Sequence, residues 1–176
     1  MIDTKKLAEE IVSGIQYAMQ AHIYNPKTDN DTFRFWDRKT PYIIHPTWCA
    51  MTLLTETSLD EGIRINGYKA LLWHDILEDT KITELPDETP ENVQSYVREM
   101  TFNSFSEEKE SIWEKDKVIR LLKLYDKTSN LLDGVWMKDE KWNGYVKFTS
   151  ELSKDVLMNY GNLNIVKIAN ALAIKR

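Results

Sequence analysis

The sequence predicts an all-α fold in a single domain. Apolar residues recur three and four positions apart, as in Leu7, Ile11 and Ile15, which is the period of an amphipathic helix. No segment alternates apolar and polar residues as a half-buried strand does, and no internal repeat or low-complexity linker divides the chain. The 176 residues, 42% of them hydrophobic, are enough for one domain over 1–176 with its own core.

The first predicted helix covers residues 5–24, where the apolar stripe continues to His22. Residues 25–41 contain Asn, Pro and Asp in a cluster that breaks this period, so we expect a loop. Pro46 suits the first position of a second helix, because its missing N–H has no helical partner there in any case. We expect that helix to run to about Ser58, which places His45 at its start.

The remaining segments predict further helices separated by short links. Gly62 and Gly67 indicate a link, and residues 68–79 then have the spacing of a third helix. Thr89 and Pro90 form a helix start for a segment that ends near Thr101. We expect one long helix over 107–133 that stops at Gly134, another over 139–160 that stops at Gly161, and a last one from 162 to the end of the sequence.

Charge and composition exclude several classes of function. Lys and Arg number 23 against 28 Asp and Glu, so the net charge of -5 gives no attraction to nucleic acid or to an anionic membrane surface. No apolar run approaches the roughly 20 residues that a membrane helix needs. The first residues lack an apolar signal core, and the single Cys49 fits a reducing compartment, so we expect a cytoplasmic protein.

A local basic cluster is the exception to the acidic balance. Lys115, Lys117, Arg120 and Lys123 lie close together in the sequence. Such a cluster forms either a solvated helix face or a contact for a small polyphosphate, and the solvated face is the more common case.

The third predicted helix holds an unusual density of titratable groups. His74 and Asp75 are followed one turn later by Glu78 and Asp79, within a segment that is otherwise apolar. Carboxylates are rarely buried without a cation or hydrogen-bond partners, and the apolar neighbours require part of this face to turn inward. A bound metal ion would resolve that conflict.

A second carboxylate of this kind is Asp126, which interrupts a strongly apolar helical run, with Asn130 four residues later on the same face. Together with His45, His74 and Asp75 it makes a mixed nitrogen and oxygen set suited to Mn, Fe or Zn, with positions left for water and substrate. Each part has an ordinary explanation when taken singly: a cap, a chance dipeptide or a surface ion pair. Their occurrence together favours a metal site.

The segments RKTPYIIHP, ALLWHDILEDT, VREMTF and LLKLYDKTSNLLDG resemble the HD-domain metal phosphohydrolases, and among them the RelA/SpoT-type alarmone hydrolases. The resemblance covers about residues 10–175 and implies a helical HD-domain bundle. It implies four metal ligands, usually around Mn²⁺: His45, His74, Asp75 and Asp126.

The resemblance also implies roles for other residues. Glu78 and Asp79 would align and deprotonate the attacking water, and Asn130 would help to position water or substrate. Arg38 and Lys39 match the Arg-Lys pair that lies against the nucleotide in that family. The loop between His22 and this pair is longer than in the family, which points to an insertion that reshapes the purine pocket.

The activity implied is removal of pyrophosphate from the 3' position of ppGpp or pppGpp, which yields GDP or GTP. Because the synthetase and regulatory domains of the long family members are absent, we expect hydrolysis only. Two alternatives stay open: a nucleotidase or phosphodiesterase acting on another nucleotide, such as a nucleoside monophosphate or an adenosine alarmone, and a nucleotide-binding module without turnover. The sequence leaves the oligomeric state open.

Overall fold

The computed structural model describes residues 3–28, 31–35 and 37–173. Every regular element within these ranges is a helix, and none is a strand. They are α1 (Thr4–Tyr24), α2 (Ile44–Leu54), α3 (Glu61–Trp73), α4 (Ile76–Asp79), α5 (Glu91–Met100), α6 (Phe105–Ser111), the 3₁₀ turn η2 (Ile112–Glu114), α7 (Lys117–Leu132), the 3₁₀ turn η3 (Gly134–Trp136), α8 (Asp139–Tyr160) and α9 (Asn164–Leu172). Pairing between extended residues is limited here to two isolated bridges. The predicted all-α fold is confirmed.

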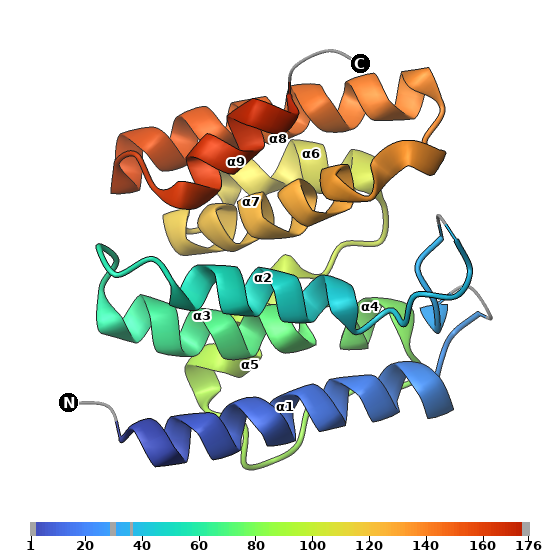
Figure 1. Cartoon of the computed structure of the whole chain (residues 1–176), viewed down its shortest axis with the longest axis vertical. Helices are drawn as coiled ribbons and strands as arrows, with labels where there is room; N and C mark the ends of the chain where they lie inside the picture. Colours follow the sequence, from blue (N-terminus) through green and yellow to red (C-terminus); the bar gives the residue numbers. More distant parts are fainter. Residues whose placement is uncertain (1–2, 29–30, 36, 174–176) are drawn as a thin grey trace.

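The long helices lie roughly side by side in layers (Figure 1). In that view α1 forms one edge, the α2–α3 pair and then α7 follow, and α8 with α9 forms the other edge. Helix α7 packs against α2, α3, α5, α8 and α9, and most of its residues are buried. Because α7 is surrounded by other helices, most of its polar side chains lie in the core, Asp126 among them. Among the described residues, no helix combines the length and the apolar character that a membrane span requires.

Several predicted boundaries are confirmed. Helix α1 matches the first prediction within one residue, and α8 ends at Gly161, which has a φ of 82° and so uses the freedom of glycine to stop the helix. The second helix stops at Leu54, four residues before the expected Ser58.

The predicted link at Gly62 and Gly67 is wrong, because both residues lie inside α3. A Cβ added at Gly67 would lie 2.6 Å from Leu53 Cδ2. This glycine therefore allows α2 and α3 to approach closely, and its role is packing between helices rather than a turn.

Two predicted long helices are broken in the structure. The expected helix over 68–79 is interrupted at His74 and Asp75, which separate α3 from the short α4. The expected helix over 107–133 consists of α6, η2 and α7, and Asp116 caps the start of α7 by accepting a hydrogen bond from the Val118 amide.

Candidate metal centre

Three helices bring two histidines and an aspartate to one buried point. His45 lies in the first turn of α2, His74 directly follows α3, and Asp126 lies in the middle of α7. One ligand atom from each of them falls within 4.8 Å of the other two. All three side chains are buried.

The fourth predicted ligand, Asp75, faces both histidines. Its Oδ1 is 3.1 Å from His74 Nε2, and its Oδ2 is 3.4 Å from His45 Nε2. His45 Nε2 is also 3.4 Å from Asp126 Oδ1. The structure therefore brings the four predicted residues together, with two imidazole nitrogens and carboxylate oxygens turned toward a common centre.

Hydrogen bonds on the far side of each ring set this orientation. His74 Nδ1 donates to the Leu71 carbonyl at 2.8 Å, and His45 Nδ1 lies 2.8 Å from Ser129 Oγ. The Nε2 atom of His74 is buried and forms no well-aligned hydrogen bond, although the Asp75 and Asp126 carboxylates lie 3.1 and 3.8 Å from it. A ring whose other nitrogen is fixed by a neighbour is the usual arrangement of a metal-binding histidine, so this donor set fits a divalent transition metal.

The charges around the centre set the protonation of the ligands. Burial lowers the pKa of His74, but the carboxylates of Asp75 and Asp126 outweigh it and raise that pKa to about 9. Burial and the Arg34 guanidinium lower the pKa of His45. In the metal-free protein a proton on His74 therefore compensates the two carboxylates, and a bound cation would replace it.

Asp126 is held by two lysines of its own helix. Lys123 Nζ and Lys127 Nζ lie 3.1 and 3.2 Å from its Oδ2, and Asn130 Nδ2 donates to its Oδ1 at 2.7 Å. Burial alone would raise the pKa of Asp126, but the ammonium groups of Lys127 and Lys123 hold it well below its ordinary value. Because the lysines bind Oδ2, the other oxygen is left to face the histidines.

The lysines share a second acid, Glu108 of α6. Lys127 Nζ is 2.7 Å from Glu108 Oε2, and Lys123 Nζ is 3.6 Å from Glu108 Oε1. Glu108 was not predicted, because it stands among charged residues in a segment of surface character. The solvated face expected for the basic cluster is also wrong for Lys123, which is 2% exposed, while Arg120 is paired with Asp155 at 2.8 Å.

The predicted acid/base pair, Glu78 and Asp79, lies on α4 beside the centre. One hydroxyl, Tyr42 Oη, lies 2.8 Å from Asp75 Oδ2 and 2.8 Å from Asp79 Oδ2, so it bridges a candidate ligand and a candidate base. Burial, followed by the charge of Asp75, raises the pKa of Asp79 to about 8, and burial also raises the pKa of Glu78. Tyr42 was not predicted, although its place three residues before His45 was a usable signal.

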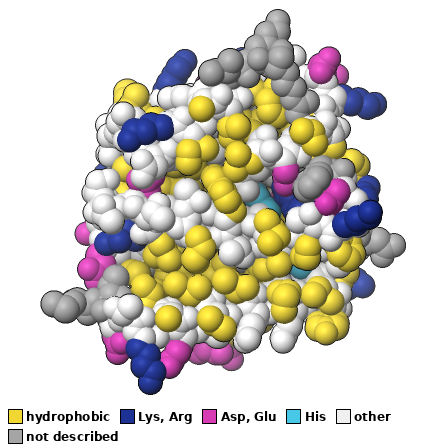
Figure 2. Space-filling model, in the orientation of Figure 1, with side chains coloured by type: hydrophobic (Ala, Val, Ile, Leu, Met, Phe, Trp, Pro, Cys, Tyr) yellow, Lys and Arg dark blue, Asp and Glu magenta, His cyan; other side chains and the backbone are white. Residues whose placement is uncertain are grey.

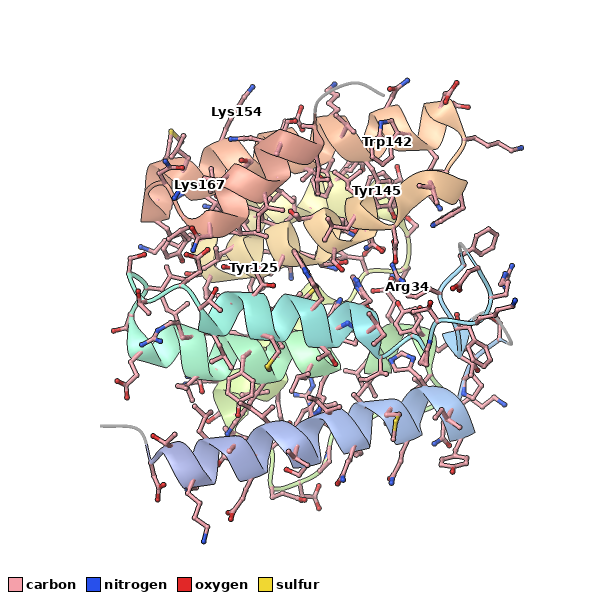
Figure 3. All side chains as sticks on the ribbon, viewed as in Figure 1. Arg34, Tyr125, Trp142, Tyr145, Lys154 and Lys167 are labelled. Carbon is pink, nitrogen blue, oxygen red and sulfur yellow. The ribbon has the colours of Figure 1, made fainter. Side chains whose placement is uncertain are left out.

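The loop after α1 reaches the site through Arg34 rather than through Arg38 and Lys39. Arg34 is 6% exposed, and its guanidinium donates to both carboxylate oxygens of Asp133, at 2.6 and 2.9 Å, and to Asn130 Oδ1 at 3.1 Å. Figure 3 labels Arg34 between this loop and the end of α7. Arg38 and Lys39 are exposed, and the Arg38 guanidinium lies over the Phe35 ring at 4.1 Å.

A cavity of about 170 Å³ opens beside these residues, lined by Arg34, Thr40, Ile44, His45, Trp48, Ser129, Leu132 and Asp133. Cavities of about 260 and 460 Å³ lie along α1 and α3, and neither is lined by a residue of the metal centre. In the space-filling view, histidine comes to the surface only in small areas, one of them beside acidic and basic side chains (Figure 2). The metal centre is thus buried, and His45 connects it to the cavity of about 170 Å³.

Comparison with known proteins adds a structural relative. No family model and no curated protein matches the chain, whereas ten chains of solved structures do. One is the structure of a metazoan ortholog of SpoT that hydrolyses ppGpp and plays a role in starvation responses. It superimposes with a TM-score of 0.69 at 21% sequence identity, over 93% of this chain and 93% of that chain. The chain therefore has the fold of an HD-domain structure, with an HD-like cluster of two histidines and an aspartate at its centre.

Proposed function

We propose that the whole chain, 1–176, is one hydrolase domain that removes pyrophosphate from the 3' position of guanosine alarmones in a metal-dependent reaction. The observation that carries the proposal is the meeting of His45, His74, Asp75 and Asp126 beside a second pair of acids on α4. The likeness to a protein that hydrolyses ppGpp supports the choice of substrate class.

The four residues His45, His74, Asp75 and Asp126 would hold the metal, which we propose to be Mn²⁺. When bound, such an ion supplies Lewis acidity toward a phosphate oxygen and lowers the pKa of water. The Nε2 of His74, which forms no well-aligned hydrogen bond, and the two aspartates beside it form a donor set that fits this ion.

The acids on α4 would handle the proton of the attacking water. Tyr42 holds the Asp79 carboxylate in a fixed position relative to Asp75, which would place Asp79 to accept a proton beside the metal. Glu78 stands on the same short helix and would align the water from its other side. A base and a ligand that share one hydroxyl keep a constant spacing, which is the positioning that phosphoryl chemistry needs.

The substrate would enter beside Arg34 and Asn130. Asn130 touches both Asp126 and Arg34, so it links the metal centre to the cavity and suits the positioning of water or a substrate oxygen. Arg38 and Lys39, both exposed on the same loop, would meet the anionic oxygens of a nucleotide as it approaches. The substrate is thus a small nucleotide, bound with its phosphates toward α4 and α7.

Pyrophosphate release from ppGpp, with and without Mn²⁺, tests the proposal. The Asp75→Asn variant should lose turnover and bind Mn²⁺ more weakly, whereas Asp87→Asn, the same change at an exposed position, should behave as the wild type. Nucleoside monophosphates, cyclic nucleotides and an adenosine alarmone belong in the same panel. Turnover of one of these but not of ppGpp would move the activity to another nucleotide, and full activity of Asp75→Asn would refute the metal assignment.

A further inference from the structure

The loop that follows α1 is attached to the short helix that carries the two candidate acids. Helix α4 has only 4 residues, Ile76–Asp79, so none of its carbonyl groups is bonded by an amide within the helix itself. Carbonyls without partners leave a single turn free to unwind, and Glu78 and Asp79 depend on this turn for their direction. Figure 1 shows the loop beside α4.

All four carbonyls of α4 are in fact bonded, and one loop residue bonds three of them. The Ile76 carbonyl accepts from the Thr80 amide at 3.1 Å and from Thr80 Oγ1 at 2.7 Å. The Leu77 and Glu78 carbonyls accept from Lys27 Nζ at 3.0 and 2.6 Å. The Asp79 carbonyl accepts from the Lys27 amide at 3.0 Å.

The rest of the loop holds Lys27 in place. The Lys81 amide donates to the Asn25 carbonyl at 2.7 Å, which completes a short antiparallel pairing of the loop with the residues that follow α4. Beyond Lys27, the Thr28 amide donates to Asp31 Oδ2 at 2.7 Å, and His22 Nδ1 donates to the Asp31 carbonyl at 3.2 Å. The residues on both sides of Lys27 are thus held by hydrogen bonds, from the backbone on one side and through Asp31 on the other.

We propose that Lys27 is a positioning residue for Glu78 and Asp79, and that this is a role of the loop after α1. Its ammonium group has three protons, and two of them are given to carbonyls of the turn that bears the acids. Lys27 thereby acts on the backbone of α4 and not on the substrate. The inference rests on the proposed hydrolase function only for its kinetic consequence. The clamp, by which we mean the hydrogen bonds from Lys27 to the α4 carbonyls, can be measured without turnover.

The test compares Lys27→Met, which keeps the chain length and removes the ammonium, with Lys27→Arg and with Lys81→Met. Lys81 is an exposed neighbour that bonds the Asn25 carbonyl through its amide and not through its side chain. The Lys81→Met variant therefore removes the same charge near the same helix and keeps this hydrogen bond. Amide hydrogen exchange at Asp79 and Thr80 reports opening of α4, because these amides bond to the Asp75 and Ile76 carbonyls. In Lys27→Met both should exchange about tenfold faster, as expected for the loss of charge-assisted hydrogen bonds.

The kinetic arm separates positioning from substrate binding. In Lys27→Met, kcat for the nucleotide should fall about tenfold with KM unchanged, because a small misplacement of a base slows the chemical step. Lys27→Arg should restore most of kcat, and Lys81→Met should match the wild type in both measurements. A rise in KM alone, or exchange rates equal to those of Lys81→Met, would overturn the proposal.

The two failures can be told apart. If the wild type turns over no nucleotide but Lys27→Met still opens α4, the clamp stands and the proposed function fails. If the wild type is active and Lys27→Met opens α4 without loss of kcat, the role in positioning fails.

Discussion

Replacing Lys127 with methionine should strongly destabilise the fold, because it leaves an acid in the core without its close partner. Glu108 is 4% exposed, and Lys127 Nζ lies 2.7 Å from its Oε2. The other cation, Lys123, is 3.6 Å from Oε1 and also serves Asp126 at 3.1 Å. Removal of one partner of a buried ion pair typically costs about 3 to 5 kcal/mol in the free energy of unfolding.

A double variant isolates the free energy of the interaction between Lys127 and Glu108. Lys127→Met combined with Glu108→Leu removes one charge of each sign and leaves Lys123 paired with Asp126, so most of the lost stability should return. Urea denaturation of the metal-free protein measures the four corners of this cycle. Lys5→Met is the control, because the Lys5–Glu9 pair is 3.8 Å apart with side chains 86% and 68% exposed, and its loss should cost less than about 1 kcal/mol.

The reasoning would be refuted if Lys127→Met were as stable as Lys5→Met, or if the double variant were less stable than the single one. The first result would mean that Glu108 becomes protonated or hydrated at little cost. The second would mean that Glu108 still stabilises the fold without Lys127, through its contact with Lys123, and is not an uncompensated charge.

Three further predictions concern metal, pH and packing. Mn²⁺ at a hundredfold excess over its Kd should raise the free energy of unfolding by about 2.7 kcal/mol in the wild type, with no effect in His74→Ala, as measured by thermal unfolding. In the metal-free fold the pKa of Asp79 is raised to about 8 by burial, whereas the unfolded chain releases that proton near pH 4, so stability should fall as the pH rises from about 4 to 8. Asp79→Asn should flatten that dependence, and equal slopes would contradict it. Gly67→Ala should cost about 1 to 3 kcal/mol in urea denaturation because its Cβ would meet Leu53 at 2.6 Å. Gly144→Ala, inside α8 with 3.9 Å to the nearest atom, should instead stabilise by about 0.5 to 1 kcal/mol.

Most of the fold followed from local patterns in the chain. The 3.6-residue period predicted the helices, and Gly161 predicted the end of α8. The prediction failed at Gly67, because a glycine in the sequence can indicate either a link between helices or a close contact between them. Gly67 stands in the middle of a helix for the sake of its neighbour Leu53, and no local sequence rule distinguishes that use of glycine from a link.

At the site, the break in the helix at His74 and Asp75 was not predicted from the sequence. A continuous helix would have put these residues and the pair Glu78 and Asp79 on one face at fixed spacing. The structure instead ends α3 at Trp73 and begins α4 at Ile76, and the loop residue Lys27 supplies the carbonyl partners that such a short helix lacks. That compensation comes from about 50 residues away in the sequence, so the local pattern could not reveal it.

The sequence by itself determined which residues form the candidate centre, because histidines and aspartates in an apolar helical context require a cation or a partner wherever the chain places them. Only the tertiary structure decided how they are held: Tyr42 between Asp75 and Asp79, Glu108 behind the two lysines, and Arg34 rather than Arg38 or Lys39 at the end of α7. The physical reason is that burial creates the need for a partner locally, whereas the partner that satisfies it is whichever polar group the packing of distant helices brings within hydrogen-bond distance.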